Sequence, residues 1–180
     1  MEVDLAGRVA WVSGPPSALK DAIAVALATN GATVADATPG RLDILVHLAE
    51  STMEAARLVQ ASTATMPQGG RIVLLTSALG LVPARGEAEA GIAAAGVVHL
   101  ARSLAMELAG DGILVNAIAV GALAGDPLAL RQRTHAQFGP ATPQDVANAV
   151  LFAVDPDSSY LTVHVLTVDG GWTAGYTRDF

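Results

Sequence analysis

The chain has 180 residues, of which 52% are hydrophobic, and this length and composition predict one folded domain with a sizeable core. A net charge of −7 argues against nucleic acid or an anionic membrane surface as a partner, and no apolar run reaches the length of a membrane span. The absence of cysteine excludes disulfides and thiolate chemistry, and the first residues lack the pattern of a signal peptide, so we expect a cytoplasmic protein.

Apolar runs and turn residues predict the secondary structure of the first third of the chain. Short apolar runs indicate strands, and apolar residues at helical spacing indicate one helix between the first two strands. We expect strands at 8–12, 32–35 and 42–48 and a helix at 17–30, which Asn30 and Gly31 end. A strand, a helix and a parallel strand in succession are typical of the opening of a dinucleotide-binding fold.

The middle of the chain predicts a second unit of this kind. An apolar run entered through Gly69 and Gly70 indicates a buried strand, and Ser77 follows it. A long helical pattern comes next, with Gly110 as its expected C-terminal cap. The expected elements are a helix at 52–66, a strand at 71–76, a helix at 88–108 and a strand at 113–120. Strand, helix and strand with short joints predict a parallel crossover.

The last third predicts two helical segments and a closing strand. Thr142, Pro143 and Asp145 have the spacing of a capped helix start. The expected elements are a short helical segment at 127–137, a helix at 143–154 and a strand at 163–168. We therefore expect a single domain over residues 1–180.

The segment from Gly70 to Val120 contains three adjoining motifs. They are GRIVLLTS, which ends at Ser77, AGVVHLARSLAMELA in the long predicted helix, and LVNAIAVG after it. This segment closely resembles the catalytic half of the short-chain dehydrogenase/reductase family, in which a strand ends in serine and the next helix carries Tyr-x-x-x-Lys. Ser77 matches that serine, and counting along the helix places Ala90 at the tyrosine and Ala94 at the lysine. The resemblance implies an active-site scaffold without the two side chains that do the chemistry.

The resemblance also implies the fold class, an α/β, Rossmann-like, doubly wound parallel sheet in a three-layer sandwich. Between Asp36 and Arg41 the family has another helix, an edge strand and a further helix, whereas this chain has a short linker. That linker is too short for a helical crossover. We therefore expect a fold reduced by the loss of an edge strand and its flanking helices.

The first turn of the family, Thr-Gly-x-x-x-Gly-x-Gly, is degraded here. Gly14 is retained, but Ala18 and Lys20 replace the glycines that let pyrophosphate approach bare backbone. Either Lys20 pairs with a phosphate or it points to solvent from a decayed site, and the second interpretation is favoured. Asp36 could hold an adenosine ribose, although a solvated loop aspartate is the favoured interpretation. We expect this chain to bind no cofactor, with NAD(P) held by an active partner.

Other positions of the family's site are also changed. His47 and Glu50 stand in the turn where the family has Asn-Asn-Ala-Gly, and we interpret His47 as a structural substitution. Ser51 is nearest by count to the family's proton-relay asparagine, and Gly125 replaces a threonine that contacts the nicotinamide amide.

Little chemistry remains at this site. Ser77 has no base at motif spacing, and alanines at the tyrosine and lysine positions supply neither a proton donor nor a cation. Glu87 or Glu89 could act as a base, but acidic residues at a helix start are better explained by the helix dipole. We expect no metal site because the histidines show no ligand spacing; they are His47, His99, His135 and His164.

The helix at 88–108 is apolar on more than one side, which predicts a partner surface. In the family, this helix and the preceding one form the main dimer interface. The predicted function is therefore a catalytically inactive homologue, serving as a structural or regulatory subunit of a hetero-oligomeric NAD(P)-dependent oxidoreductase. Its expected partner is a catalytically complete family member bound through the helices at 52–66 and 88–108, and self-association is the other arrangement. The alternatives are an active reductase with a repositioned residue and a small-molecule binding protein that uses the vacated pocket.

Overall fold

The computed structural model describes residues 2–125 and 139–175. Within these residues, six strands form one sheet in the order β2-β1-β3-β4-β5-β6, and every neighbouring pair is parallel. The strands are β1 (Val9–Ser13), β2 (Thr33–Ala35), β3 (Ile44–Leu48), β4 (Arg71–Ser77), β5 (Leu114–Val120) and β6 (Val165–Val168). The predicted Rossmann-like α/β fold is confirmed.

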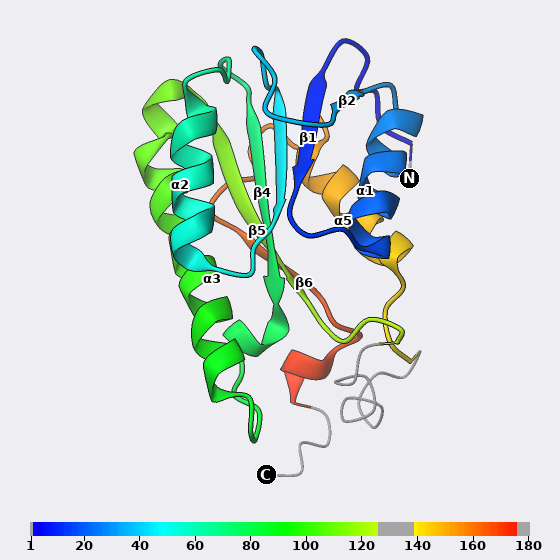
Figure 1. The fold of residues 1–180 in the computed structure, drawn as a ribbon, viewed down its shortest axis with the longest axis vertical. Helices are drawn as coiled ribbons and strands as arrows, with labels where there is room; N and C mark the ends of the chain where they lie inside the picture. Colours follow the sequence, from blue (N-terminus) through cyan, green and yellow to red (C-terminus); the bar gives the residue numbers. More distant parts are fainter. Residues whose placement is uncertain (1, 126–138, 176–180) are drawn as a thin grey trace.

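Helices cover both faces of the sheet and make a three-layer sandwich (Figure 1). The helices on one face are α1 (Ala18–Thr29) and α5 (Pro143–Val154), and those on the other are α2 (Thr52–Thr63) and α3 (Ala88–Glu107). Alternate residues of β4 point to the two layers. Val73 and Leu75 join the core cluster that includes α1 and α5, whereas Ile72 and Leu74 join the one that includes α2 and α3. The central strands have continuously apolar sequences because they are buried on both faces.

The connection between β2 and β3 is where the fold is reduced. The strand order is that of a doubly wound dinucleotide-binding sheet from which the strand outside β2 has been removed, as predicted. The carboxylate of Asp43 secures this shortened connection. It is fully buried and accepts hydrogen bonds from the Val9 N–H at 2.9 Å and from Arg41 Nη2 at 2.9 Å. The sequence pattern had not indicated this contact.

The helix predicted at 52–66 is shorter than expected. It ends at Thr63, and the hydroxyls of Ser62 and Thr63 donate to the carbonyl oxygens of Leu58 and Gln60 in its last turns. The predicted start of the last helix is correct, since Thr142 and Asp145 form a reciprocal capping box.

Two predicted boundaries are wrong for conformational reasons. Gly110 does not cap α3, because it lies inside the 3-10 turn η2 (Ala109–Asp111), and the left-handed residue is Gly112, with φ of 70°. The last strand begins at Val165 rather than 163, because Val163 has φ of 63°, which no strand residue adopts. The segment predicted at 127–137 lies outside the described residues. No helix in the described part of the chain is long and apolar enough to cross a membrane.

Candidate functional site

Ser77 closes β4, at the edge of the sheet where the family has its serine. Its Oγ accepts a hydrogen bond from the Leu79 N–H at 3.2 Å and so caps the short 3-10 turn η1 (Ala78–Gly80). The side chain is half-buried. In this structure the Ser77 hydroxyl therefore supports the local turn.

The turn after Ser77 packs directly against α3. A β-carbon added to Gly80 would lie 2.6 Å from the carbonyl carbon of Ala94 and 2.7 Å from the backbone nitrogen of Ala95. One turn earlier on the helix, a β-carbon on Gly91 would lie 3.4 Å from the Leu79 carbonyl oxygen. The structure thus brings the loop of the serine position against the helical turn that carries the tyrosine and lysine positions.

Those two helix positions differ in their surroundings. Ala90 is exposed, whereas Ala94 is only 5% exposed. Neither methyl group can donate a proton or carry a charge. The geometry of the site therefore presents apolar surface at both positions.

The first turn of the fold lies against the end of β3. Gly14 has φ of 129°, and a β-carbon there would lie 2.7 Å from the Leu48 β-carbon. The Lys20 ammonium donates to the Gly14 carbonyl oxygen at 3.1 Å, and Ser17 caps α1 by accepting the Lys20 N–H. Lys20 is thus held to its own turn, which neither of the two sequence-based alternatives anticipated. Ala18 is the first residue of α1.

Asp36 follows β2 directly and is exposed. The register pairs Trp11 with Ala35, so β2 stops two residues before β1 does. No described hydrogen bond or ion pair of the Asp36 side chain fixes it to the turn at Gly14. Asp36 is therefore placed as a surface residue at the truncated edge.

His47 is buried at the C-terminal end of β3, in register with Ser13 on β1 and Leu74 on β4. Among the described residues, neither of its ring nitrogens has a hydrogen-bond partner. Burial lowers the pKa of His47, and the charge of Glu54 opposes that shift in part. Burial therefore favours the neutral ring, and the interpretation of His47 as a structural substitution stays a prediction.

The C-terminal turn covers the loop that follows Ser77. Trp172 is buried and forms a small apolar cluster with Ala78 and Leu79. Its turn is held by Asp169, which accepts hydrogen bonds from the Gly171 and Thr173 N–H groups at 2.8 Å each. Trp172 therefore packs into a small core of its own beside the loop that follows Ser77.

Within the described residues, no group of three or more histidine, aspartate or glutamate side chains could hold a metal ion. Of the four histidines, His135 lies outside those residues, as does much of the segment after Gly125.

The chain matches one protein-family model over most of its length. The family model described as enoyl-(acyl carrier protein) reductase matches residues 19–173. The chain belongs to the short-chain dehydrogenase/reductase family. It is 37% identical over 110 residues to a 3-oxoacyl-[acyl-carrier-protein] reductase of Synechocystis, a match that covers 58% of this chain and 44% of the relative. It is 40% identical over 116 residues to a galactitol 2-dehydrogenase of Cereibacter sphaeroides, covering 58% and 46%. The chain spans about half the length of these relatives.

Solved structures of short-chain dehydrogenases match the whole fold. A short-chain dehydrogenase from Burkholderia cenocepacia in complex with NADP has a TM-score of 0.82 at 25% identity, covering 93% of this chain and 98% of that one. A dehydrogenase/reductase from Sinorhizobium meliloti has a TM-score of 0.81 at 26% identity, covering 94% and 96%. The family's sheet and helical layers are therefore retained in this shortened member.

Proposed function

We propose that this chain is a catalytically inactive short-chain dehydrogenase homologue that serves as a structural or regulatory subunit of a hetero-oligomeric NAD(P)-dependent oxidoreductase. One observation carries the proposal. The loop after Ser77 lies against α3 as an active site would require, yet the helix presents Ala90 and Ala94 there. A family scaffold is present around positions that cannot take part in proton transfer.

The chemistry of carbonyl reduction supports the proposal that this chain is catalytically inactive. The reaction needs an acid that protonates the carbonyl oxygen and a positioned group that assists it. Ser77 could orient a carbonyl, but it is not itself an acid strong enough for the step. Glu89 lies in the first turn of α3, where a carboxylate is stabilised by the helix dipole. The helix dipole is enough to explain an acidic residue at this solvent-exposed helix start, so Glu89 needs no catalytic role.

The cofactor turn supports assigning NAD(P) to a partner. Phosphate groups bind where backbone N–H groups at a helix N-terminus are accessible. Here Pro15 and Pro16 supply no N–H, and the Lys20 ammonium already donates to the Gly14 carbonyl oxygen. A dinucleotide would therefore approach a turn that has few backbone N–H donors.

The outer surface of the α2 and α3 layer supports association. Ile92 and Met106 on α3 are 74% and 73% exposed, and Met53 on α2 is 62% exposed. His99 and Arg102 lie between the two α3 residues on the same exposed face, so this surface is mixed rather than wholly apolar. A surface of this composition suits an interface with another folded subunit. The proposed partner is a catalytically complete family member.

Cofactor titration tests the proposal that this chain is catalytically inactive. We expect isothermal titration of the purified chain with NADH and with NADPH to give no binding heat, while a complete family member titrated in parallel binds. Micromolar binding of either nucleotide by this chain would overturn the assignment and favour an active reductase with a repositioned residue.

Light scattering tests the partner. Ala95→Arg places a charge on the exposed face of α3, and Ala28→Arg places one on the exposed face of α1, in the other helical layer. We expect the first variant to abolish assembly with a co-expressed complete relative and the second to leave it intact. A chain that stays monomeric with and without the relative would disprove the subunit role, and a homo-oligomer that ignores the relative would disprove the mixed assembly.

A further inference from the structure

His47 is a buried ionisable side chain that the proposed function does not use. It is 1% exposed, and both of its ring nitrogens lack a hydrogen-bond partner among the described residues. A buried polar group without a partner is costly, and it points to a special role or to a group that exchanges partners.

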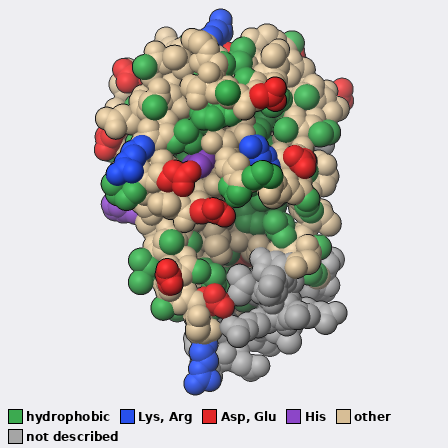
Figure 2. All heavy atoms as spheres, viewed as in Figure 1, with side chains coloured by type: hydrophobic (Ala, Val, Ile, Leu, Met, Phe, Trp, Pro, Cys, Tyr) green, Lys and Arg blue, Asp and Glu red, His purple; other side chains and the backbone are tan. Residues whose placement is uncertain are grey.

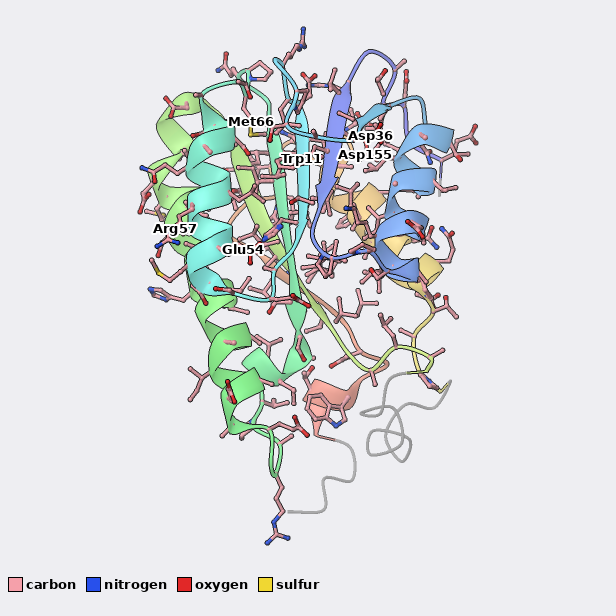
Figure 3. All side chains as sticks on the ribbon, viewed as in Figure 1. Trp11, Asp36, Glu54, Arg57, Met66 and Asp155 are labelled. Carbon is pink, nitrogen blue, oxygen red and sulfur yellow. The ribbon has the colours of Figure 1, made fainter. Side chains whose placement is uncertain are left out.

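The ring faces the helical layer of α2 and α3. Side chains alternate along a strand, so His47 shares its face with Leu45, which belongs to the core beneath α2 and α3. On the neighbouring strand, Trp11 packs against the same core and lies diagonal to His47, because the register pairs Trp11 with Leu45 and Ser13 with His47. Figure 3 shows Trp11 on the strands and Glu54 on α2 across from them. Figure 2 shows acidic and basic side chains interspersed with hydrophobic ones over the middle of this side of the molecule.

The charges around His47 come from one element. Glu54 on α2 is the ionisable group whose charge acts on the ring, and it favours protonation. On β1, the Ser13 backbone also raises the pKa of His47, although its geometry does not reach that of a hydrogen bond. On β4, the residue in register with His47 is the apolar Leu74. Like Glu54, the other ionisable residues of the two helices are exposed, but none of them contributes to the pKa shift of His47; they are Arg57, Glu89, His99, Arg102 and Glu107.

The side-chain hydrogen bonds of the first turn of α2 are long, whereas the Ala55 N–H donates to the Ser51 carbonyl oxygen at 3.0 Å. Ser51 Oγ accepts the Glu54 N–H at 3.4 Å, and Thr52 Oγ1 donates to the Ala93 carbonyl oxygen at 3.3 Å. Both are near the limit of hydrogen bonding. Thr52 also lies directly against Gly96, so this turn is the contact between α2 and the middle of α3.

We propose that His47 is a pH-sensitive element that controls how the first turn of α2 seats on the sheet. The neutral ring is buried without partners and leaves the turn in place. The imidazolium has two N–H donors, and a charge in this position needs acceptors. Outward movement of the turn admits water and lets the Glu54 carboxylate approach the ring. Because Thr52 contacts α3, the same movement loosens the packing of α2 against α3.

Amide hydrogen exchange of the full chain tests this element. After correction for intrinsic exchange, we expect the protection of the backbone amides of residues 52–57 to fall at least about tenfold between about pH 7.5 and about pH 5.5. Histidine changes charge in this pH range. The amides of β4 should keep their protection. His47→Leu removes the effect, and His99→Leu, which changes an exposed histidine on α3, leaves it in place. A Trp172→Phe background makes Trp11 the reporter of the same transition by fluorescence.

Two further variants keep the test decisive if His47→Leu does not fold. His47→Asn and His47→Gln are polar and do not ionise in this range, so both should also remove the pH dependence. The proposal is overturned if protection in α2 stays constant down to about pH 5, or if the transition persists in the His47 variants. A transition that includes β4 to the same extent is global unfolding and also overturns it.

Discussion

Gly80 and Ala94 are in such close contact that a β-carbon on the glycine would lie 2.6 Å from the alanine carbonyl carbon. This contact fixes the loop after Ser77 on the helix that carries Ala90 and Ala94, the residues predicted to occupy the family's tyrosine and lysine positions. The close packing of an active-site scaffold is therefore kept in a chain whose site carries methyl groups. The packing of this loop on α3 can therefore be tested by measuring stability, without an activity assay.

Gly80→Ala should strongly destabilise the fold, because the obstructing atoms belong to the backbone of α3 and cannot move aside cheaply. We expect a loss of about 2–3 kcal/mol in the free energy of unfolding, as for other overpacked sites. Gly110→Ala is the matched control, since nothing lies within 4 Å of a β-carbon there. Urea denaturation measures both, and equal stabilities would contradict the observed packing.

Ala90→Tyr combined with Ala94→Lys should not create a dehydrogenase. Restoring the acid and its cation does not restore the cofactor turn, and positioning precedes acid strength. The lysine substitution should also lower stability, because position 94 is buried, whereas position 90 is exposed and should accept tyrosine. Oxidation of NADPH with a generic ketone is the measurement. Turnover by the double variant would show that the site is more complete than proposed.

Ser77→Ala should cost about 0.5–1 kcal/mol of stability, the ordinary effect of removing a capping hydroxyl. The cause is loss of the hydrogen bond from the Leu79 N–H. Any activity measured on the assembled complex should change little. Ser159→Ala, on an exposed loop, serves as the control. A hundredfold loss of complex activity with assembly intact would instead give Ser77 a direct catalytic role.

Asp43→Asn should destabilise the chain by about 2 kcal/mol at neutral pH, the scale of hydrogen bonds to a charged group. Burial alone raises the pKa of Asp43, but hydrogen bonds from Arg41 and the Val9 N–H, with the charges of Arg41 and Arg8, outweigh burial and lower the pKa overall.

A lowered pKa fixes the pH dependence of this contribution. The folded state holds the proton of Asp43 less tightly than the unfolded state, so the stabilisation is complete above the ordinary value of about 4 and is lost as the pH falls through the folded pKa. The difference between wild type and Asp43→Asn should therefore shrink in urea titrations below about pH 4. Asp157→Asn, at an exposed site, is the matched control for the change of aspartate to asparagine.

Val163→Gly should stabilise the chain by about 0.5–1 kcal/mol, because a β-branched residue is strained at φ of 63° and glycine is not. The strained conformation is held by a hydrogen bond from the Val163 N–H to the Val115 carbonyl oxygen at 2.9 Å, which glycine keeps. Val165→Gly, at the first residue of β6, should destabilise instead. Thermal melting distinguishes the two, and a lower melting temperature for Val163→Gly would show that its half-exposed side chain contributes more than the strain costs.

The sequence alone determined the order and type of the elements. Continuous apolar runs such as the one before Ser77 must be buried on both faces, so they predicted parallel strands between helical layers. The helical pattern placed Ala90 and Ala94 about one turn apart on one helix, because helical spacing is regular. Their match to the family's tyrosine and lysine positions stays a prediction. The shortened linker after Asp36 predicted the missing edge strand, because too few residues remain to form it.

The tertiary structure alone decided which distant groups meet. Nothing in the sequence indicated that the loop at Gly80 packs against Ala94, that Asp43 accepts a hydrogen bond from the Val9 N–H, or that His47 is buried without partners among the described residues. These contacts join residues whose spacing follows no helical or strand period, so no local pattern carries them. They depend on how the sheet twists and how closely each helix docks on it, which is set by the packing of the whole chain.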